Sequence, residues 1–173
     1  ISYFMLIFYS FLAIDELVDV EHLEVLLKSV TISKRNYFSL DQCHMLLVLY
    51  DLDCKGTLSY VQLQQLCTDL EECFQLFLRH DKTFSRTISG SELKTALADI
   101  GINANQAMID MLVNRYGSKM NIIVEGVPIR ELKFNNFAIC VLKLRKTLIF
   151  WDIKLRNTSV ANFEAKAGQQ SLQ

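Results

Sequence analysis

The acidic side chains near Asp51 are spaced in a way that suits a divalent cation. Asp51 and Asp53 occupy the first and third positions of a twelve-residue segment, with Thr57 at the seventh and Gln62 at the twelfth. Ca²⁺ is bound by oxygen ligands that recur along such a loop, one of them a backbone carbonyl, around a sharp turn at a glycine. Gly56 occupies that turn. The segment therefore predicts metal ligands at Asp51, Asp53, Thr57 and Gln62.

A second segment of the same design begins 30 residues later, at Asp81. It has an aliphatic residue, Ile88, at the eighth position, where the first segment has Leu58, and it closes on a carboxylate, Glu92. Because only this segment retains the closing carboxylate, we expect it to be the occupied one if either binds a cation. Its predicted ligands are Asp81, Thr83, Ser85, Thr87 and Glu92.

Basic residues inside both segments weaken the case for tight binding. Lys55 replaces an oxygen ligand in the first segment, and Arg86 replaces the turn glycine in the second. Affinity for Ca²⁺ follows the number of carboxylates and the rigidity of the site, so we expect it to be weaker than ~10⁻⁴ M, or absent. The alternative is that both segments are ordinary helix–loop–helix turns whose Asp residues cap helices.

Helical patterns flank both acidic segments. Ser39 and Gln42 have the spacing of a capping box, which predicts the start of a helix that ends at Asp51. A long helix is expected over Leu63–His80, which contains neither Gly nor Pro. Only one Pro and six Gly occur in the chain, which favours an all-α fold. Further helices are expected over Glu92–Asp99, from a cap at Asn103 and Gln106 to Gly117, and over Asn135–Leu155.

The fold class expected from these patterns is all-α, built of paired helix–loop–helix units with minimal β contacts between loops. Leu58 and Ile88 are the aliphatic residues that would pair loops through a short strand, so we expect the Asp51 and Asp81 loops to contact each other. Asn121–Val124 is expected to form a short strand. Glu125–Pro128 is expected to be a surface turn.

Tandem segments of this kind resemble EF-hands, and their spacing across one shared helix is similar to the penta-EF-hand family. The surrounding residues resemble the C-terminal calcium-binding domain of calpain large subunits, over about residues 4 to 154. Phe38–Cys43 resembles the entry into the second hand, Glu92–Leu97 the exit from the third, and Phe134–Leu144 the exit from the fourth. The resemblance implies a calmodulin-like domain over residues 1–155, with hands near 4–28, 39–66, 67–99 and 104–145, the remnant of a fifth hand from 136, and a divergent polar tail over 156–173.

The resemblance implies Ca²⁺ as the cofactor, but the chain departs from the family's pattern where ligands are needed. The fourth loop, around Gly117–Val124, contains no carboxylate, and Glu125–Lys133 resembles an insertion. His22 is expected to close the first loop in place of a Glu. The expectation is therefore a helical framework whose metal sites are weak or vestigial.

The resemblance further implies a non-catalytic regulatory and dimerisation domain of a calpain-like calcium-dependent cysteine endopeptidase. The catalytic residues of calpains lie in other domains, so the parent chain would be the protease and its core a partner of this domain. Cys43 and His44 are adjacent on a helix and point roughly 100° apart, which does not suit a nucleophile and its base. No catalytic residue is expected here. The alternative is a stand-alone penta-EF-hand adaptor that presents an apolar groove to a peptide or protein.

A run of large apolar residues near the end of the chain predicts self-association. Leu148, Ile149, Phe150 and Trp151 are consecutive and would cover most of a helix's circumference. Penta-EF-hand domains pair through the fifth hand, so the resemblance implies a homodimer, or a pair with a related small subunit, centred on Leu144–Leu155. The alternative is that this helix is buried within one chain.

Composition limits the other partners. The net charge of −1 leaves no basic excess for nucleic acid. The five Cys have no metal or disulfide spacing, which indicates reduced thiols and a cytoplasmic location.

Twelve of the first fourteen residues are apolar, but this run is too short to span a bilayer and lacks basic flanks, so packing is expected rather than membrane insertion. The first residue is Ile, not Met, which favours a segment of a longer chain.

Overall fold

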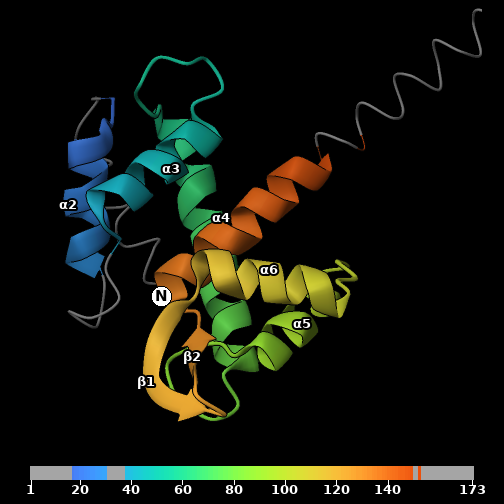
Figure 1. The fold of residues 1–173 in the computed structure, drawn as a ribbon. Helices are drawn as coiled ribbons and strands as arrows, with labels where there is room; N and C mark the ends of the chain where they lie inside the picture. The colour runs from blue at the N-terminus through green and yellow to red at the C-terminus, as the bar shows by residue number, and fades with distance from the viewer. Residues whose placement is uncertain (1–16, 31–37, 150–151, 153–173) are drawn as a thin grey trace, which may run out of the picture. The chain divides into compact units, whose positions relative to one another are not determined.

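The computed structural model describes residues 17–30, 38–149 and 152 (Figure 1). The chain divides into two compact units, Ile1–Val141 and Leu142–Gln173. Several expected features lie outside the described residues: the apolar run Ile1–Ile14, Phe150, Trp151 and the polar tail from Arg156. None of the described helices is long and apolar enough to cross a membrane.

Three of the five helices α2 to α6 flank the two acidic loops (Figure 1). The capping box expected at Ser39 is present, and two further ones occur at Ser59 and Ser89; each serine accepts a hydrogen bond from the backbone N–H three residues later. The side chains at those later positions bond back to the serine N–H, which satisfies donors that a helix start leaves unpaired. The helices are α2 (Val20–Val30), α3 (Leu40–Tyr50), α4 (Tyr60–His80), α5 (Gly90–Asp99) and α6 (Gln106–Tyr116).

Sequence patterns located α3 to α6 well, with small errors at their starts. The helices α4 and α5 begin a few residues before the predicted Leu63 and Glu92, because Ser59 and Ser89 are the capping residues. The predicted cap at Asn103 is wrong. Asn105 caps α6 instead, and its side chain accepts the N–H of Met108 at 2.9 Å. Residues 134–149 are helical as well.

The two short β contacts expected at Leu58 and Ile88 are both present, but their partners differ from the expected ones. Leu58 pairs with Val18, and Ile88 pairs with Leu132, each as an isolated antiparallel bridge. The expected contact between the Asp51 and Asp81 loops is therefore wrong. The loops lie at opposite ends of α4, whose 21 residues span about 31 Å at the rise of an α-helix.

The short strand expected over Asn121–Val124 is present, as part of a longer β-hairpin that follows α6. Strands β1 (Ser118–Val124) and β2 (Val127–Glu131) pair antiparallel, and the hairpin projects from the helices (Figure 1). Glu125 and Gly126 both have positive φ, as a tight two-residue hairpin turn requires. The turn is therefore shorter than predicted, because Val127 and Pro128 belong to β2.

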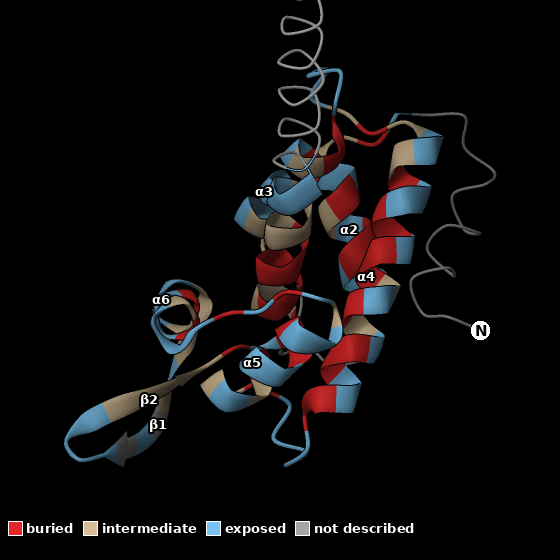
Figure 2. Cartoon of the chain, turned by 90° about the vertical axis from the view of Figure 1, so that its right-hand side faces the viewer, coloured by how far each residue is buried: buried red, intermediate tan, exposed pale blue. Residues whose placement is uncertain are grey.

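The core of the first unit forms around α4. Buried residues recur along this helix at spacings of three and four, from Leu63 through Leu66 and Leu70 to Phe77 (Figure 2). Phe77 packs edge-to-face against Phe134 and Phe137, with ring centroids 5.7 and 5.5 Å apart. These contacts anchor the helix that follows the hairpin to α4. Cys67, Cys73 and Cys140 are buried as well.

Candidate metal-binding loops

The Asp51 loop (residues 51–62) is organised by one buried carboxylate. Asp51 lies directly after α3, and its Oδ1 and Oδ2 accept the N–H groups of Lys55 at 3.0 Å and Gly56 at 2.6 Å. Gly56 has a φ of +75°, so the sixth position turns as predicted. These two hydrogen bonds hold the Asp51 carboxylate against the backbone of the turn.

Two of the remaining predicted ligands of the Asp51 loop, Asp53 and Gln62, have protein partners. The carboxylate of Asp53 is 3.2 Å from the Lys55 ammonium group, and both side chains are exposed. Gln62 directs its Oε1 to the N–H of Ser59 at 2.8 Å, where it caps α4. Thr57 is half-buried. With a cation already beside Asp53 and an amide at the closing position, this donor set does not fit Ca²⁺.

The Asp81 loop (residues 81–92) has the same frame. Asp81 is 7% exposed, and its Oδ1 and Oδ2 accept the N–H groups of Ser85 at 2.9 Å and Arg86 at 2.8 Å. These bonds match position for position those that Asp51 makes. The two loops therefore repeat one structure, which was predicted from their matched sequence positions.

Arg86 takes up the left-handed conformation in spite of its side chain. Its φ is +63°, against +75° for Gly56 at the corresponding position, and Phe84 and Cys54 also share a positive φ at the fourth position. A non-glycine residue in this region costs on the order of 1 kcal/mol. The loop keeps its shape because Asp81 holds the Arg86 N–H, so the loss of glycine does not abolish the turn.

A chain of hydroxyl groups extends from Asp81 toward the hairpin. The Ser85 Oγ lies 3.3 Å from Asp81 Oδ1 and 2.9 Å from Thr87 Oγ1. Thr87 is buried, and its hydroxyl donates to Glu131 Oε2 at the end of β2. Sequence reasoning missed Glu131, although it lies in the expected insertion directly before Leu132, the residue that pairs with Ile88.

The closing carboxylate of the Asp81 loop is held by the start of α5. Glu92 Oε2 accepts the Ser89 N–H at 2.9 Å and its hydroxyl at 2.8 Å, and Oε1 accepts the Lys82 N–H at 3.2 Å. Thr83, the remaining predicted ligand, is exposed. The candidate ligand atoms of this loop are all oxygens, which fits a hard cation such as Ca²⁺. A cation would have to share these oxygens with the protein's own donors.

The described residues contain no group of three or more His, Cys, Asp or Glu side chains placed to hold a metal. The structure brings Asp81, Ser85 and Thr87 into one hydrogen-bonded chain. Glu92 instead faces the backbone at the loop's two ends.

The fourth loop is interrupted by the hairpin. It begins at Gly117 after α6 and reaches its β contact only at Leu132, with β1 and β2 between. Asn136 then occupies the closing position of this hand, and its Oδ1 accepts from Gln42 Nε2 at 2.6 Å. The closing position of this hand therefore carries a neutral amide that is bonded to another helix.

Cys43 and His44 are not arranged as a nucleophile and its base. Cys43 is buried, and burial raises the pKa of its thiol to about 12, so the thiolate is not populated near neutral pH. Its Sγ faces the carbonyl of Phe38 at 3.9 Å, whereas His44 is exposed. The same argument applies to Cys67 and Cys140, whose burial raises the pKa of each thiol to about 12.

Comparisons with known proteins show that the chain is similar to calpain subunits. No family model matches the chain. Calpain small subunit 2 of Homo sapiens is 27% identical over 111 residues, which cover 64% of this chain and 41% of that protein. The calpain-1 catalytic subunit of Rattus norvegicus is 26% identical over 151 residues, which cover 84% of this chain and 20% of that protein.

A solved structure supports the fold. A homologue of programmed cell death 6 protein from Leishmania major Friedlin superposes with a TM-score of 0.56 at 18% identity, covering 78% of this chain and 68% of that one. The chain spans less than half the length of the curated relatives described here. With its tandem helix–loop–helix units, its bridged loops and its similarity to both calpain subunits, the chain is a penta-EF-hand domain of the calpain type.

Proposed function

We propose that this chain acts as a non-catalytic regulatory and dimerisation domain of a calpain-like cysteine endopeptidase, with weak or vestigial Ca²⁺ sites. The main support for the proposal is that the helix–loop–helix framework is kept, while side chains at the metal-ligand positions are bonded to the protein itself. Leu58 and Ile88 keep the β bridges that join hands. The oxygens of Gln62 and Glu92, at the closing positions, are bonded to the protein's own backbone. A domain that keeps the helix–loop–helix framework, but whose candidate metal ligands are bonded to its own backbone, is suited to binding other protein segments.

We propose that the domain covers residues 1–155, with 156–173 as a divergent tail, and that the protease core of the parent chain is one partner. The similarity to both small and catalytic calpain subunits supports this placement. Ca²⁺ would bind the Asp81 loop before the Asp51 loop, because the former has a carboxylate at the closing position. The proposed ligands are Asp81, Thr83, Ser85, Thr87 and Glu92, with Asp51, Asp53, Thr57 and Gln62 as a vestigial set.

Calorimetric titration of the domain with Ca²⁺ tests this order. The expected result is no site tighter than ~10⁻⁴ M. Any heat that is observed should disappear in Glu92→Gln. It should persist in the matched change Glu72→Gln on α4, which lies outside both loops. A site tighter than ~10⁻⁶ M would show that the basic residues and protein hydrogen bonds do not weaken the loops as argued.

Introducing carboxylates at two positions of the Asp51 loop tests the same proposal from the opposite direction. The double variant Gln62→Glu and Lys55→Asp returns the closing carboxylate and replaces the cation beside Asp53. It should create a site in the Asp51 loop that binds Ca²⁺ measurably more tightly than the unmodified domain. If the double variant binds no better, the loop's frame rather than its ligands is what prevents binding.

We propose that dimerisation, with a second copy or a related small subunit, involves the segment Leu144–Leu155. Leu148 and Ile149 support this proposal, because both are exposed, at 49% and 57%, on the helix of the second unit. Large apolar residues exposed side by side are typical of interaction surfaces. Sedimentation equilibrium at micromolar concentration should give twice the mass of one chain. Leu148→Asp should halve it, and the neighbouring exposed Thr147→Asp should not; a single-chain mass for the unmodified domain would refute the homodimer.

A further inference from the structure

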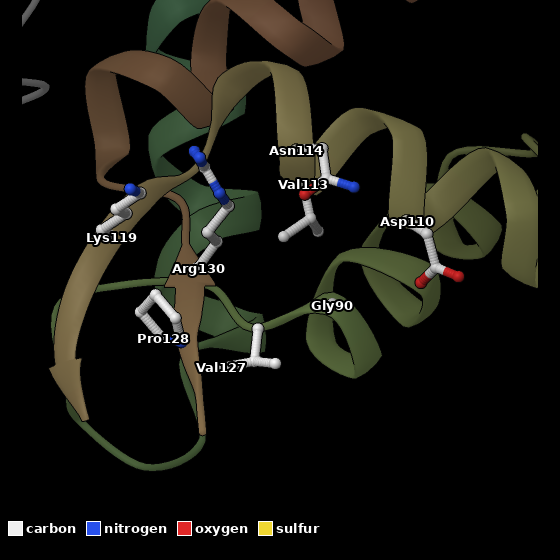
Figure 3. Close-up of a pocket in the computed structure, with 8 residues that line it drawn as sticks. All are labelled: Gly90, Asp110, Val113, Asn114, Lys119, Val127, Pro128 and Arg130. Atoms are coloured by element: carbon white, nitrogen blue, oxygen red, sulfur yellow. The ribbon is translucent and has the colours of Figure 1, made fainter. Parts of the chain in front are cut away.

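A cavity of about 570 Å³ opens between α5, α6 and the β1–β2 hairpin (Figure 3). It belongs entirely to the first unit and uses none of the residues proposed to bind Ca²⁺. The hairpin contributes Lys119, Val127, Pro128 and Arg130 to its lining, and α6 contributes Asp110 and Val113. Because one wall is the hairpin inserted into the fourth loop, the cavity is a product of that insertion.

One end of the cavity is cationic. Lys119 and Arg130 are directly paired across the two strands, and both line the cavity (Figure 3). Like charges opposite each other in a strand pair repel. Arg130 uses one guanidinium nitrogen to donate to the carbonyl of Gly117 at 3.1 Å. Neither side chain has an ion pair with any carboxylate in the described part of the chain, so the positive charge of this end is not neutralised there.

The other walls provide apolar contact and an acidic end. Val113, Val127 and Pro128 line the cavity, and Val127 is 66% exposed. Asp110 lies at the end away from Lys119 and Arg130 (Figure 3). Gly90 leaves one wall without a side chain, where a Cβ would rest against Ile109 and Val113 at ordinary contact distances of 3.5 and 3.6 Å.

We propose that this cavity binds a short extended segment of a partner protein that carries an Asp or Glu beside an apolar residue. Its carboxylate would accept charge-assisted hydrogen bonds from Lys119 and Arg130. The apolar neighbour would cover Val113 and Val127, which removes apolar surface from water. Asp110 at the far end would accept from the segment's backbone N–H groups or from a basic residue.

The residues that line the cavity favour this protein segment over a free carboxylate anion and over nucleic acid. A free carboxylate anion would leave the apolar walls and most of the volume uncovered, so it would gain only the charge contact. Nucleic acid would bring its phosphates close to Asp110, and the chain has a net charge of −1. Binding of such a segment requires neither Ca²⁺ nor a protease core, so it can be tested independently of the proposed function.

Titrations of the isotope-labelled chain followed by amide NMR test the inference with defined probes. The probe is the tripeptide Val-Glu-Val, acetylated and amidated at its ends, with Val-Gln-Val and free glutarate as comparisons. The acidic peptide should shift the amide signals of Lys119, Val113 and Arg130 in a saturable way. The neutral peptide should bind about tenfold more weakly, as expected from the loss of hydrogen bonds to a charged group.

Charge-matched variants locate the site. Lys119→Glu should weaken binding of the acidic peptide at least about tenfold, since it replaces attraction by repulsion. Lys94→Glu, which makes the same charge change on the exposed face of α5, should leave binding within about twofold. Lys119→Gln provides a milder change should the charge reversal disturb the hairpin, which the amide spectrum would reveal.

Three results would overturn the inference. Equal binding of the neutral peptide would show that the carboxylate does not contribute to binding. Equal loss in Lys94→Glu and Lys119→Glu would indicate general charge attraction and no defined site. Glutarate binding as tightly as the acidic peptide would identify an anion site in which the apolar walls play no part.

Discussion

The hydroxyl of Thr87, in the Asp81 loop, donates a hydrogen bond to the carboxylate of Glu131 at the end of β2. The two residues are 44 positions apart in the sequence. Next to them, Ile88 and Leu132 exchange backbone hydrogen bonds of 2.8 and 2.9 Å. The side-chain bond therefore adds a second connection between a candidate metal loop and the inserted hairpin.

Removing this connection should destabilise the first unit. Glu131→Ala should lower the free energy of unfolding by about 1–2 kcal/mol, because the buried Thr87 hydroxyl loses a charged acceptor and keeps only Ser85. Urea denaturation followed by circular dichroism measures the change. Glu125→Ala, at the exposed hairpin turn, is the matched control and should change stability by less than about 0.5 kcal/mol. Similar values for both variants would contradict a stabilising role for the Thr87–Glu131 bond.

Two glycines should respond to alanine in opposite ways. A Cβ on Gly117 would lie 2.4 Å from the Val113 carbonyl oxygen, so Gly117→Ala requires the junction of α6 and β1 to move. We expect a loss of about 1–3 kcal/mol. Gly90→Ala places its Cβ at normal contact distance in the first turn of α5 and should stabilise by about 0.4–1 kcal/mol. Thermal unfolding of the two variants beside the unmodified chain compares them, and a stable Gly117→Ala would show that the junction is not tightly fixed.

The cysteines should differ sharply in reactivity. Cys54 is exposed, whereas the other four thiols are buried, and burial raises the pKa of Cys43, Cys67 and Cys140 to about 12. Only thiolates react with a disulfide reagent such as Ellman's reagent. At pH 8 the native protein should release one equivalent rapidly and five after denaturation, and Cys54→Ser should abolish the rapid phase. Rapid release of two or more equivalents from the native protein would show that buried thiols become accessible.

Stability should depend on the ionisation of Asp99 at acid pH. Hydrogen bonds from His80 and Arg79 lower the pKa of this carboxyl below its usual value near 3.8. A carboxyl whose pKa is lower in the folded state contributes stability that is present above its unfolded pKa and is lost as the pH falls through the folded one. The unmodified chain should therefore be more stable than Asp99→Asn at pH 6, and the difference should shrink as the pH falls below about 4, toward the lowered pKa of Asp99 in the folded state. A difference that stays constant across this range would mean that the carboxylate's charge is not responsible.

The sequence by itself determined the local elements of this protein. Capping boxes at Ser39, Ser59 and Ser89 join residues three positions apart, so the same short segment that carries the pattern also makes the bonds. The frame of each acidic loop is local for the same reason, since Asp51 and Asp81 hold N–H groups four and five residues ahead. The helix starts and loop turns therefore follow from neighbours along the chain.

The tertiary structure alone decided which segments meet. Leu58 and Ile88 had the right character for a β bridge, but α4 separates their loops, and the choice of Val18 and Leu132 depends on how whole helices pack. Glu131 reaches Thr87 only because an inserted hairpin returns the chain to the Asp81 loop. Such contacts join residues distant in sequence, and no local pattern encodes them, because their free energy arises from surfaces that exist only once the helices have assembled.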